Sequence, residues 1–112
     1  MNISLSSHVL NLDSGKPAAD MQVTLSRIAS DGSLQLLAEG CTDEDGRVSG
    51  WTVADAQGAR LQVCFLTGLW FEAHGQTVFY PQVVVDFMPA EAGHYHIPLL
   101  VNRHGYSTYR GS

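Results

Sequence analysis

Short runs of β-branched, aromatic and aliphatic residues, separated by turn residues, are the feature that most constrains how this chain folds. Turn signals such as Asp31-Gly32 and Asp45-Gly46 stand between the runs, and no run shows a long helical period. Short strands at this spacing are typical of an antiparallel β-sandwich with two sheets. We expect about eight strands, over residues 4–10, 21–29, 34–41, 50–53, 60–67, 80–88, 94–102 and 106–110.

The segment TGLWFEAHG, residues 67–75, departs from this pattern. Its apolar residues are too irregularly spaced for a strand, so we expect a short helix there. Pro81 and Pro98 should lie at strand starts, at sheet edges or at bulges, because proline has no N–H to donate to a neighbouring strand. The sequence therefore predicts an all-β fold with one short helix.

Length and composition predict one domain with a substantial core. The chain has 112 residues, of which 45% are hydrophobic and 15% charged, so we expect a single folded domain over residues 1–112. The net charge of -5 argues against nucleic acid as a partner, because phosphates attract basic surfaces. The first residues, MNISLSSHVL, lack a basic region followed by a long apolar run, and we expect no membrane partner. By default, the protein is expected to be cytoplasmic.

The two cysteines, Cys41 and Cys64, match neither a disulfide framework nor a metal-binding motif. A single bridge between them is left open. Cys64, next to Val63 and Phe65 in an expected strand, is interpreted as a small buried hydrophobic residue. The sequence also has no GxSxG elbow, phosphate loop, CxxC pair or HExxH helix. We expect no metal and no cofactor.

Four polar residues in the expected strands and turns are candidates for chemistry. Alone, His8 is best read as a strand histidine on a solvated face, with a general base as the alternative. His94 and His96 share one face of a strand, but a metal would need a third ligand, and none has an obvious position. Arg47 follows a turn, where a solvated side chain is usual and an anion clamp is the functional alternative.

The chain ends in YSTYRGS, which is unusual because C-terminal residues tend to fray. If the segment docks at a sheet edge as a strand, its last residues become positioned groups. The alternative is an ordinary edge strand that pairs with another subunit. Both interpretations require an ordered terminus.

Four stretches of the chain together resemble one known family. SHVLNLDSGKPAADMQVTL, TDEDGRV, HYHIPLL and the terminal YSTYRGS are similar to the 5-hydroxyisourate hydrolases, the transthyretin-like enzymes of purine breakdown. The similarity runs from about Leu5 to Ser112, and the terminal YRGS is its most specific part. Transthyretin shares the fold but lacks this ending and the histidines, so the motif separates the enzymes from the hormone carriers.

The resemblance implies a transthyretin-like two-sheet sandwich that hydrolyses 5-hydroxyisourate to 2-oxo-4-hydroxy-4-carboxy-5-ureidoimidazoline in urate degradation, without a cofactor. It implies a homotetramer, a dimer of dimers, whose sites lie at the dimer–dimer interface. It implies catalytic roles for His8, Arg47 and His96. It implies substrate binding by His8, Arg47, Tyr109, Arg110 and Ser112. Position by position, the motif matches His96 rather than His94.

The chain departs from the family pattern at Leu66, where aspartate is common, and at Arg103 and His104, where a proline–aromatic pair is common. No departure falls on a matched site position. His74 and His104, like His94, are expected to be surface residues.

The expected reaction is direct attack by water, since no serine nucleophile stands beside a base. His8 or His96 would activate the water, Arg47 would stabilise the anion, and Arg110 would hold the other edge of the ring. Which histidine is the base is left open. The rival interpretations are a carrier for a small aromatic ligand and a purely structural domain; the combination of two histidines and an arginine favours the hydrolase.

Overall fold

The predicted all-β sandwich with one short helix is confirmed by a computed structural model, which describes residues 1–112. It contains one strand more than expected, a two-residue strand that pairs with the end of the first. The elements in chain order are β1 (Ile3–Asn11), β2 (Lys16–Pro17), β3 (Gln22–Ile28), β4 (Leu34–Cys41), β5 (Arg47–Val53), β6 (Arg60–Phe65), α1 (Thr67–Ala73), β7 (Val83–Phe87), β8 (Gly93–Val101) and β9 (Tyr106–Thr108).

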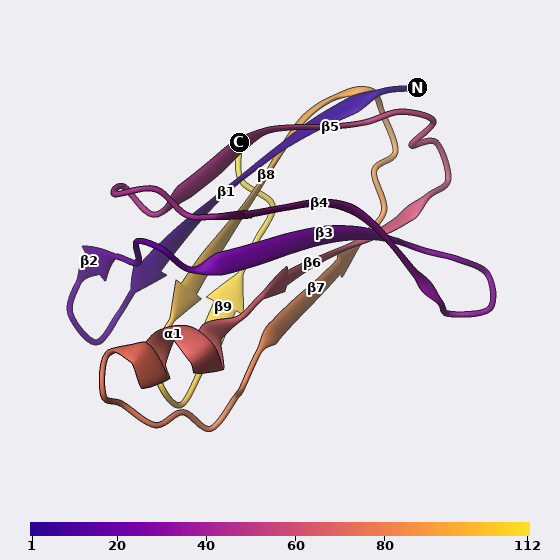
Figure 1. The fold of residues 1–112 in the computed structure, drawn as a ribbon. Coiled ribbons are helices and arrows are strands. Elements are labelled where there is room, and N and C mark those ends of the chain that lie inside the picture. The colour runs from indigo at the N-terminus through magenta and orange to yellow at the C-terminus, as the bar shows by residue number, and fades with distance from the viewer.

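The strands form two stacked sheets (Figure 1). One sheet has the order β2-β1-β8-β9, with β5 also paired to β1, and the other has the order β4-β3-β6-β7. Neighbouring strands are antiparallel except β1 and β8, which run parallel in continuous register from Ile3 opposite Gly93 to Asn11 opposite Val101. This single parallel pairing brings the first strand of the chain beside β8, a strand close to the other end of the sequence.

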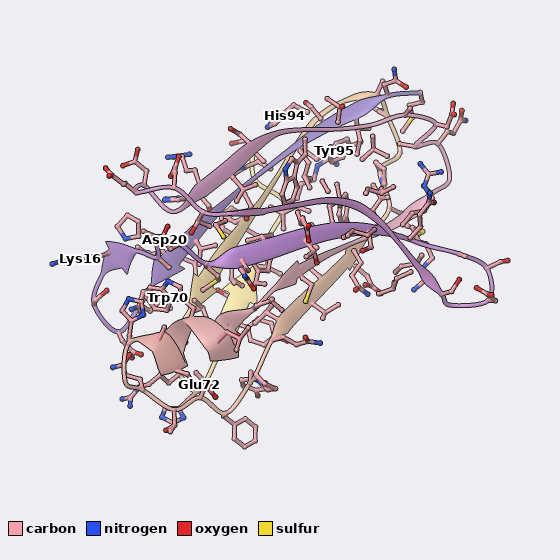
Figure 2. All side chains as sticks on the ribbon, in the orientation of Figure 1. Lys16, Asp20, Trp70, Glu72, His94 and Tyr95 are labelled. Carbon is pink, nitrogen blue, oxygen red and sulfur yellow. The ribbon has the colours of Figure 1, made fainter.

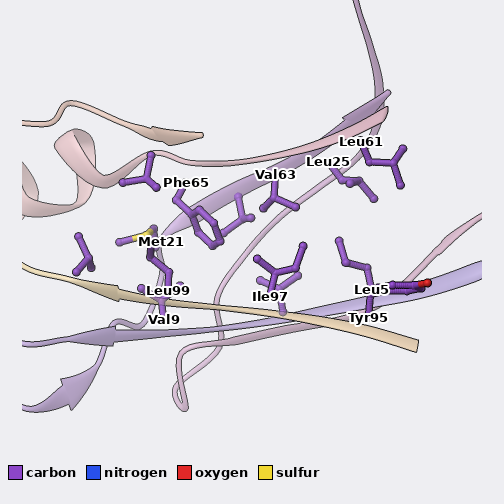
Figure 3. Packing of buried hydrophobic residues seen from close by; sticks show 14 of the residues in the cluster. Leu5, Val9, Met21, Leu25, Leu61, Val63, Phe65, Tyr95, Ile97 and Leu99 are labelled. Carbon is purple, nitrogen blue, oxygen red and sulfur yellow. The ribbon is translucent and has the colours of Figure 1, made fainter. Parts of the chain in front are cut away.

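The core lies between the sheets and follows from alternation along each strand. Leu5 and Val9 of β1 face inward with Leu99 of β8, and they pack against Val63 and Phe65 of the opposite sheet (Figure 3). Because successive strand residues point to opposite faces, the polar residues between these positions point outward. The same alternation that builds the core therefore places a row of serines and histidines on the outer face of β1 and β8.

Pro98 lies inside β8, where the pairing with the C-terminal segment is interrupted. Leu99 lies opposite Thr108 and His96 opposite Gly111, so the register is the same on both sides of the gap. Pro98 has no N–H, and its carbonyl accepts a hydrogen bond from the Thr108 hydroxyl at 2.7 Å. The expectation that Pro98 lies at a strand start, a sheet edge or a bulge is wrong, because it lies inside a strand that is paired on both sides. The interrupted pairing leaves Tyr109 and Arg110 outside the ladder.

The expected helix is confirmed as α1, and the Trp70 indole of this helix donates to the Ala19 carbonyl at 2.6 Å. The interpretation of Cys64 as a buried hydrophobic residue is wrong: Val63 and Phe65 face the core, so Cys64 lies half-buried on the other face. Both cysteines are free thiols, and burial raises the pKa of Cys64. No helix of the structure has the length and apolar character needed to span a membrane.

Candidate active site on the outer face of the sheet

The three residues expected to be catalytic come together from three strands. His8 of β1 lies directly opposite Arg47 of β5. On the other side of β1, His96 of β8 lies opposite Ser6. Because His8 is two positions beyond Ser6 on the same face, strand spacings of about 4.8 Å and a rise of about 3.3 Å per residue put the Cα atoms of His8 and His96 roughly 8 Å apart.

Arg47 is positioned by a tight turn that begins at Asp43. The Asp43 carboxylate accepts hydrogen bonds from the backbone N–H groups of Asp45 and Arg47, both at 2.9 Å. Gly46 has a φ of +75°, and its carbonyl accepts from the Val9 N–H at 2.8 Å. A Cβ at Gly46 would lie 2.5 Å from the Val9 carbonyl oxygen, so the turn requires glycine. The DG pair thus brings Arg47 into register with His8.

His96 is held by Ser6 and by the C-terminal segment, and one ring nitrogen is left open. The Nδ1 atom of the ring lies 2.8 Å from the Ser6 hydroxyl, and the backbone carbonyl of His96 accepts from the Gly111 N–H at 2.8 Å. A Cβ on Gly111 would lie 2.6 Å from Cδ2 of the ring, so the C-terminal segment packs directly against it. Nε2 has no hydrogen-bond partner in the chain and is therefore the ring nitrogen that can meet a ligand.

The surroundings of His96 favour its neutral form. Burial lowers the pKa of the imidazole below its ordinary value of about 6.5, and the positive charge of Arg47 and the neighbouring imidazoles of His8 and His94 lower it further. A hydrogen bond from the imidazole to the backbone carbonyl of Ser6 favours the protonated ring and raises the pKa in part. At neutral pH, His96 is therefore available as a base.

Ser6 and His94 join this site, although neither was assigned to it from the sequence. The Ser6 hydroxyl lies 2.8 Å from Nδ1 of His96 and also 2.8 Å from Nε2 of His94. Nδ1 of His94 lies 2.7 Å from the Ser4 hydroxyl. The available signal was the period-two spacing of Ser4, Ser6 and His8, which places all three on one face.

The C-terminal residues divide between the two faces. Arg110 turns away from His96, and its guanidinium carbon lies 4.8 Å from the ring centroid of Tyr95. Tyr95 points inward and is 7% exposed, whereas His94 lies on the outer side (Figure 2). The Arg110 guanidinium therefore packs on an inner-face residue, although Arg110 also lines one hollow together with His96 and Tyr109. Tyr109 and Ser112 are exposed and have no side-chain partner in the chain.

The remaining expected surface residues lie away from this face. His74 stacks on the indole of Trp70 with ring centroids 4.0 Å apart, and its Nδ1 lies 2.7 Å from the Trp70 carbonyl. Arg103 makes an ion pair with Asp13 at 3.5 Å, and His104 is exposed. The departures from the family pattern at 103 and 104 therefore shape a loop rather than the site.

No cavity of the single chain is lined by His8 or Arg47. The largest hollow, about 690 Å³, lies at the end of the molecule that holds α1, where Lys16, Asp20 and Trp70 gather (Figure 2). No three His, Cys, Asp or Glu side chains are arranged to hold a metal ion. The histidine face is thus open on one side, so a further surface is needed to enclose a small ligand there.

The fold and this face define a class: two-sheet β-sandwiches that present imidazoles and a guanidinium on the outside of one sheet. The sequence model of the HIUase/Transthyretin family matches residues 5–111, and the chain belongs to that family. Over 113 residues it is 41% identical to the 5-hydroxyisourate hydrolase of Salmonella dublin, an alignment that covers 99% of this chain and 82% of the relative.

Two solved structures show the same architecture. The 5-hydroxyisourate hydrolase of Klebsiella pneumoniae has a TM-score of 0.86 and 34% identity, over 97% of this chain and 98% of that chain. Transthyretin from Sparus aurata also has a TM-score of 0.86, with 25% identity over 96% of this chain and 95% of that chain. The expected transthyretin-like fold is confirmed.

Proposed function

We propose that this protein is a hydrolase that opens the six-membered ring of 5-hydroxyisourate at its cyclic amide bond. The product would be 2-oxo-4-hydroxy-4-carboxy-5-ureidoimidazoline, an intermediate of urate degradation. The observation that carries the proposal is the meeting of His8, Arg47 and His96 on one sheet face. The name of the Salmonella dublin relative supports the substrate.

In the proposed reaction, His96 is the base. Its neutral form is favoured, and Nε2 is the free ring nitrogen. Nε2 takes a proton from a water molecule while the water oxygen bonds to the amide carbon. No acyl-enzyme forms, and no step uses a metal ion. Dialysis against a chelator is therefore expected to leave the rate unchanged.

Arg47 stabilises the negative charge that develops on the carbonyl oxygen. Its planar guanidinium offers several N–H donors, and the Asp43 turn fixes the start of the side chain. His8, opposite Arg47, orients the substrate or the water. When the intermediate collapses, the C–N bond breaks and the leaving nitrogen receives a proton from a histidine.

The C-terminal segment contributes in two ways. Tyr109 and Ser112, which are free and exposed, are proposed to contact the substrate. Arg110 was expected to do the same, but it packs on Tyr95. We assign it a positioning role instead: it holds the segment so that Gly111 stays against His96.

The proposed active form is a homotetramer, a dimer of dimers with sites between the dimers. No cavity of the single chain encloses His8 or Arg47, and a second copy placed over this face would close the site. Large apolar side chains are also exposed on the edge strands and beside them, with Val84 40%, Met88 70% and Tyr109 59% exposed. Light scattering coupled to size exclusion tests the assembly. The cytoplasmic location stays a prediction.

The deciding experiment is substrate decay. Fresh 5-hydroxyisourate, made from urate with urate oxidase, is followed by ultraviolet absorbance with wild-type protein, with His96→Ala and with His104→Ala as the matched control. We expect wild type and His104→Ala to accelerate the decay and His96→Ala to lose about 10²–10⁴-fold. If folded, tetrameric wild type matches the protein-free rate, the hydrolase proposal fails and a ligand-carrier role takes its place.

A further inference from the structure

Two serines and two histidines form a continuous hydrogen-bonded chain on the outer face of the sheet. The order is Ser4, His94, Ser6 and His96, and the three links measure 2.7, 2.8 and 2.8 Å. The parallel register of β1 and β8 explains the order, because Ser4 lies opposite His94 and Ser6 opposite His96. The chain runs from the candidate site at His96 to His94, which is exposed to solvent.

The number of protons on the four side chains allows only two donor–acceptor orders for this series of hydrogen bonds. A serine hydroxyl has one hydrogen, and a neutral imidazole has one N–H. Ser6 meets a ring nitrogen on each side, so it donates to one histidine and accepts from the other. If His96 donates from Nδ1 to Ser6, then Ser6 donates to Nε2 of His94, and Nδ1 of His94 donates to Ser4. The opposite order reverses every bond.

The order in which Nδ1 of His96 donates to Ser6 allows His96 to act as a base. It places the N–H of His96 on Nδ1 and leaves the lone pair on Nε2, which faces away from Ser6 and has no partner in the chain. The reversed order places the N–H on Nε2. The direction of the hydrogen bonds through Ser6 therefore sets which tautomer of His96 meets the ligand.

We propose that Ser6 and His94 are positioning residues that set the tautomer of His96 and relay its proton between the site and solvent. The proposal rests on the proposed hydrolase function. When Nε2 takes a proton from water, the Nδ1 proton passes to Ser6, the Ser6 proton passes to His94, and His94 releases one through Ser4 to solvent. When the leaving nitrogen takes the Nε2 proton, the same transfers run in reverse, so protons balance over the cycle.

The electrostatic surroundings of His96 explain why a proton relay would help catalysis. The groups that face His96 are His8 from β1, Arg47 from β5 and His94 from β8, with Gly111 of the C-terminal segment against the ring. Burial and the charge of Arg47 disfavour a positive imidazolium at this position. Passing the proton outward lets His96 act while the charge moves away from Arg47.

The test combines Ser6→Ala with Ser6→Thr, which keeps the hydroxyl, and with Ser49→Ala, an exposed serine of β5, as the control. In the free protein, 15N spectra of the histidine rings are expected to show His96 protonated at Nδ1 in wild type and a mixture of tautomers in Ser6→Ala. For turnover, we expect Ser6→Ala to lower kcat about tenfold, the value of one hydrogen bond, at nearly constant KM.

Rates measured in mixtures of H₂O and D₂O, a proton inventory, distinguish a proton relay from a purely structural role of Ser6. Rates in mixtures of H₂O and D₂O should curve for wild type and Ser6→Thr, since several protons move together, and become linear in Ser6→Ala. His94→Gln, which keeps a hydrogen-bonding side chain but cannot pass a proton, should behave like Ser6→Ala and serves if that variant does not fold.

Two results would overturn the inference. One is a Ser6→Ala protein with unchanged kcat, pH profile and proton inventory, and the hydrolase function would survive it. The other is an unchanged His96 tautomer in Ser6→Ala. That spectrum needs no substrate, so it decides the role of Ser6 even if wild type proves to have no hydrolase activity.

Discussion

Gly111 lies opposite His96 at the end of the chain, and a Cβ there would stand 2.6 Å from Cδ2 of the imidazole and 3.1 Å from the His96 carbonyl oxygen. The glycine is required here by close approach rather than by an unusual backbone angle. The C-terminal segment therefore does more than pair with β8, because its backbone forms one wall of the position that His96 occupies.

Gly111→Ala is expected to shift the His96 ring or lift the segment away from it, while the core stays intact. A displacement of about 1 Å at a catalytic group can cost about 10²-fold in rate, and we expect a loss of that order in kcat. Gly105→Ala is the matched control, because its nearest neighbour would be 3.8 Å from the new Cβ. Equal activity of both variants in the decay assay would show that the contact at 111 does not position His96.

Gly46→Ala should disturb Arg47 from the other side of the site. The added Cβ would meet the Val9 carbonyl oxygen at 2.5 Å, and the φ of +75° is also unfavourable for alanine. We expect the clash to cost about 1–3 kcal/mol beyond the backbone strain. Gly58→Ala isolates the strain, because Gly58 has a φ of +70° with open space around it. Thermal unfolding of the two variants should differ; matching midpoints would rule out the clash.

The sequence predicted the faces of the strands better than their partners. Alternation along 94–102 correctly indicates that His94 and His96 share a face, and that face is confirmed. It cannot indicate that β8 lies parallel to β1, because those strands are joined through the whole of the intervening chain. The meeting of His8 with His96 was therefore available only from the family resemblance, and the contact of Ser6 with both imidazoles was not predicted.

For Arg110, the direction of the side chain follows from the strand register and not from the motif. Residues 109, 110 and 111 continue the register of β9, so the middle one must point to the inner face. Its motif position alone suggested substrate contact. Cys64 was misjudged because its neighbours Val63 and Phe65 already occupy the inward positions.

Arg110→Ala should loosen the C-terminal segment without unfolding the domain. A cation–π contact of an exposed arginine is worth about 0.5–1 kcal/mol, so the bond from the Gly111 N–H to the His96 carbonyl should open about two- to fivefold more often. Amide hydrogen exchange at Gly111 measures this directly. Arg60→Ala, which removes an exposed ion pair with Asp86, is the control and should leave Gly111 unchanged. Unaltered exchange in Arg110→Ala would remove its positioning role.

The lowered pKa of His96 determines how activity and stability should change with pH. A base must be unprotonated, so kcat/KM should fall on the acid side with a midpoint below about 6.5, the ordinary value for imidazole. The folded state should also lose stability as the pH falls from about 6.5 through that lower value, because the unfolded chain takes up the proton more readily.

The variant Arg47→Gln tests whether the charge of Arg47 contributes to the lowered pKa of His96. Burial is the larger effect and remains, but the positive charge is gone, so the residual activity should show its acid limb at a higher pH than wild type. The total rate should also fall, because the oxyanion loses its main donor. The measurement is the pH profile of kcat/KM for both proteins. An acid limb that stays in place in Arg47→Gln would mean that the group titrating in catalysis does not feel Arg47, and His96 would then be ruled out as the base.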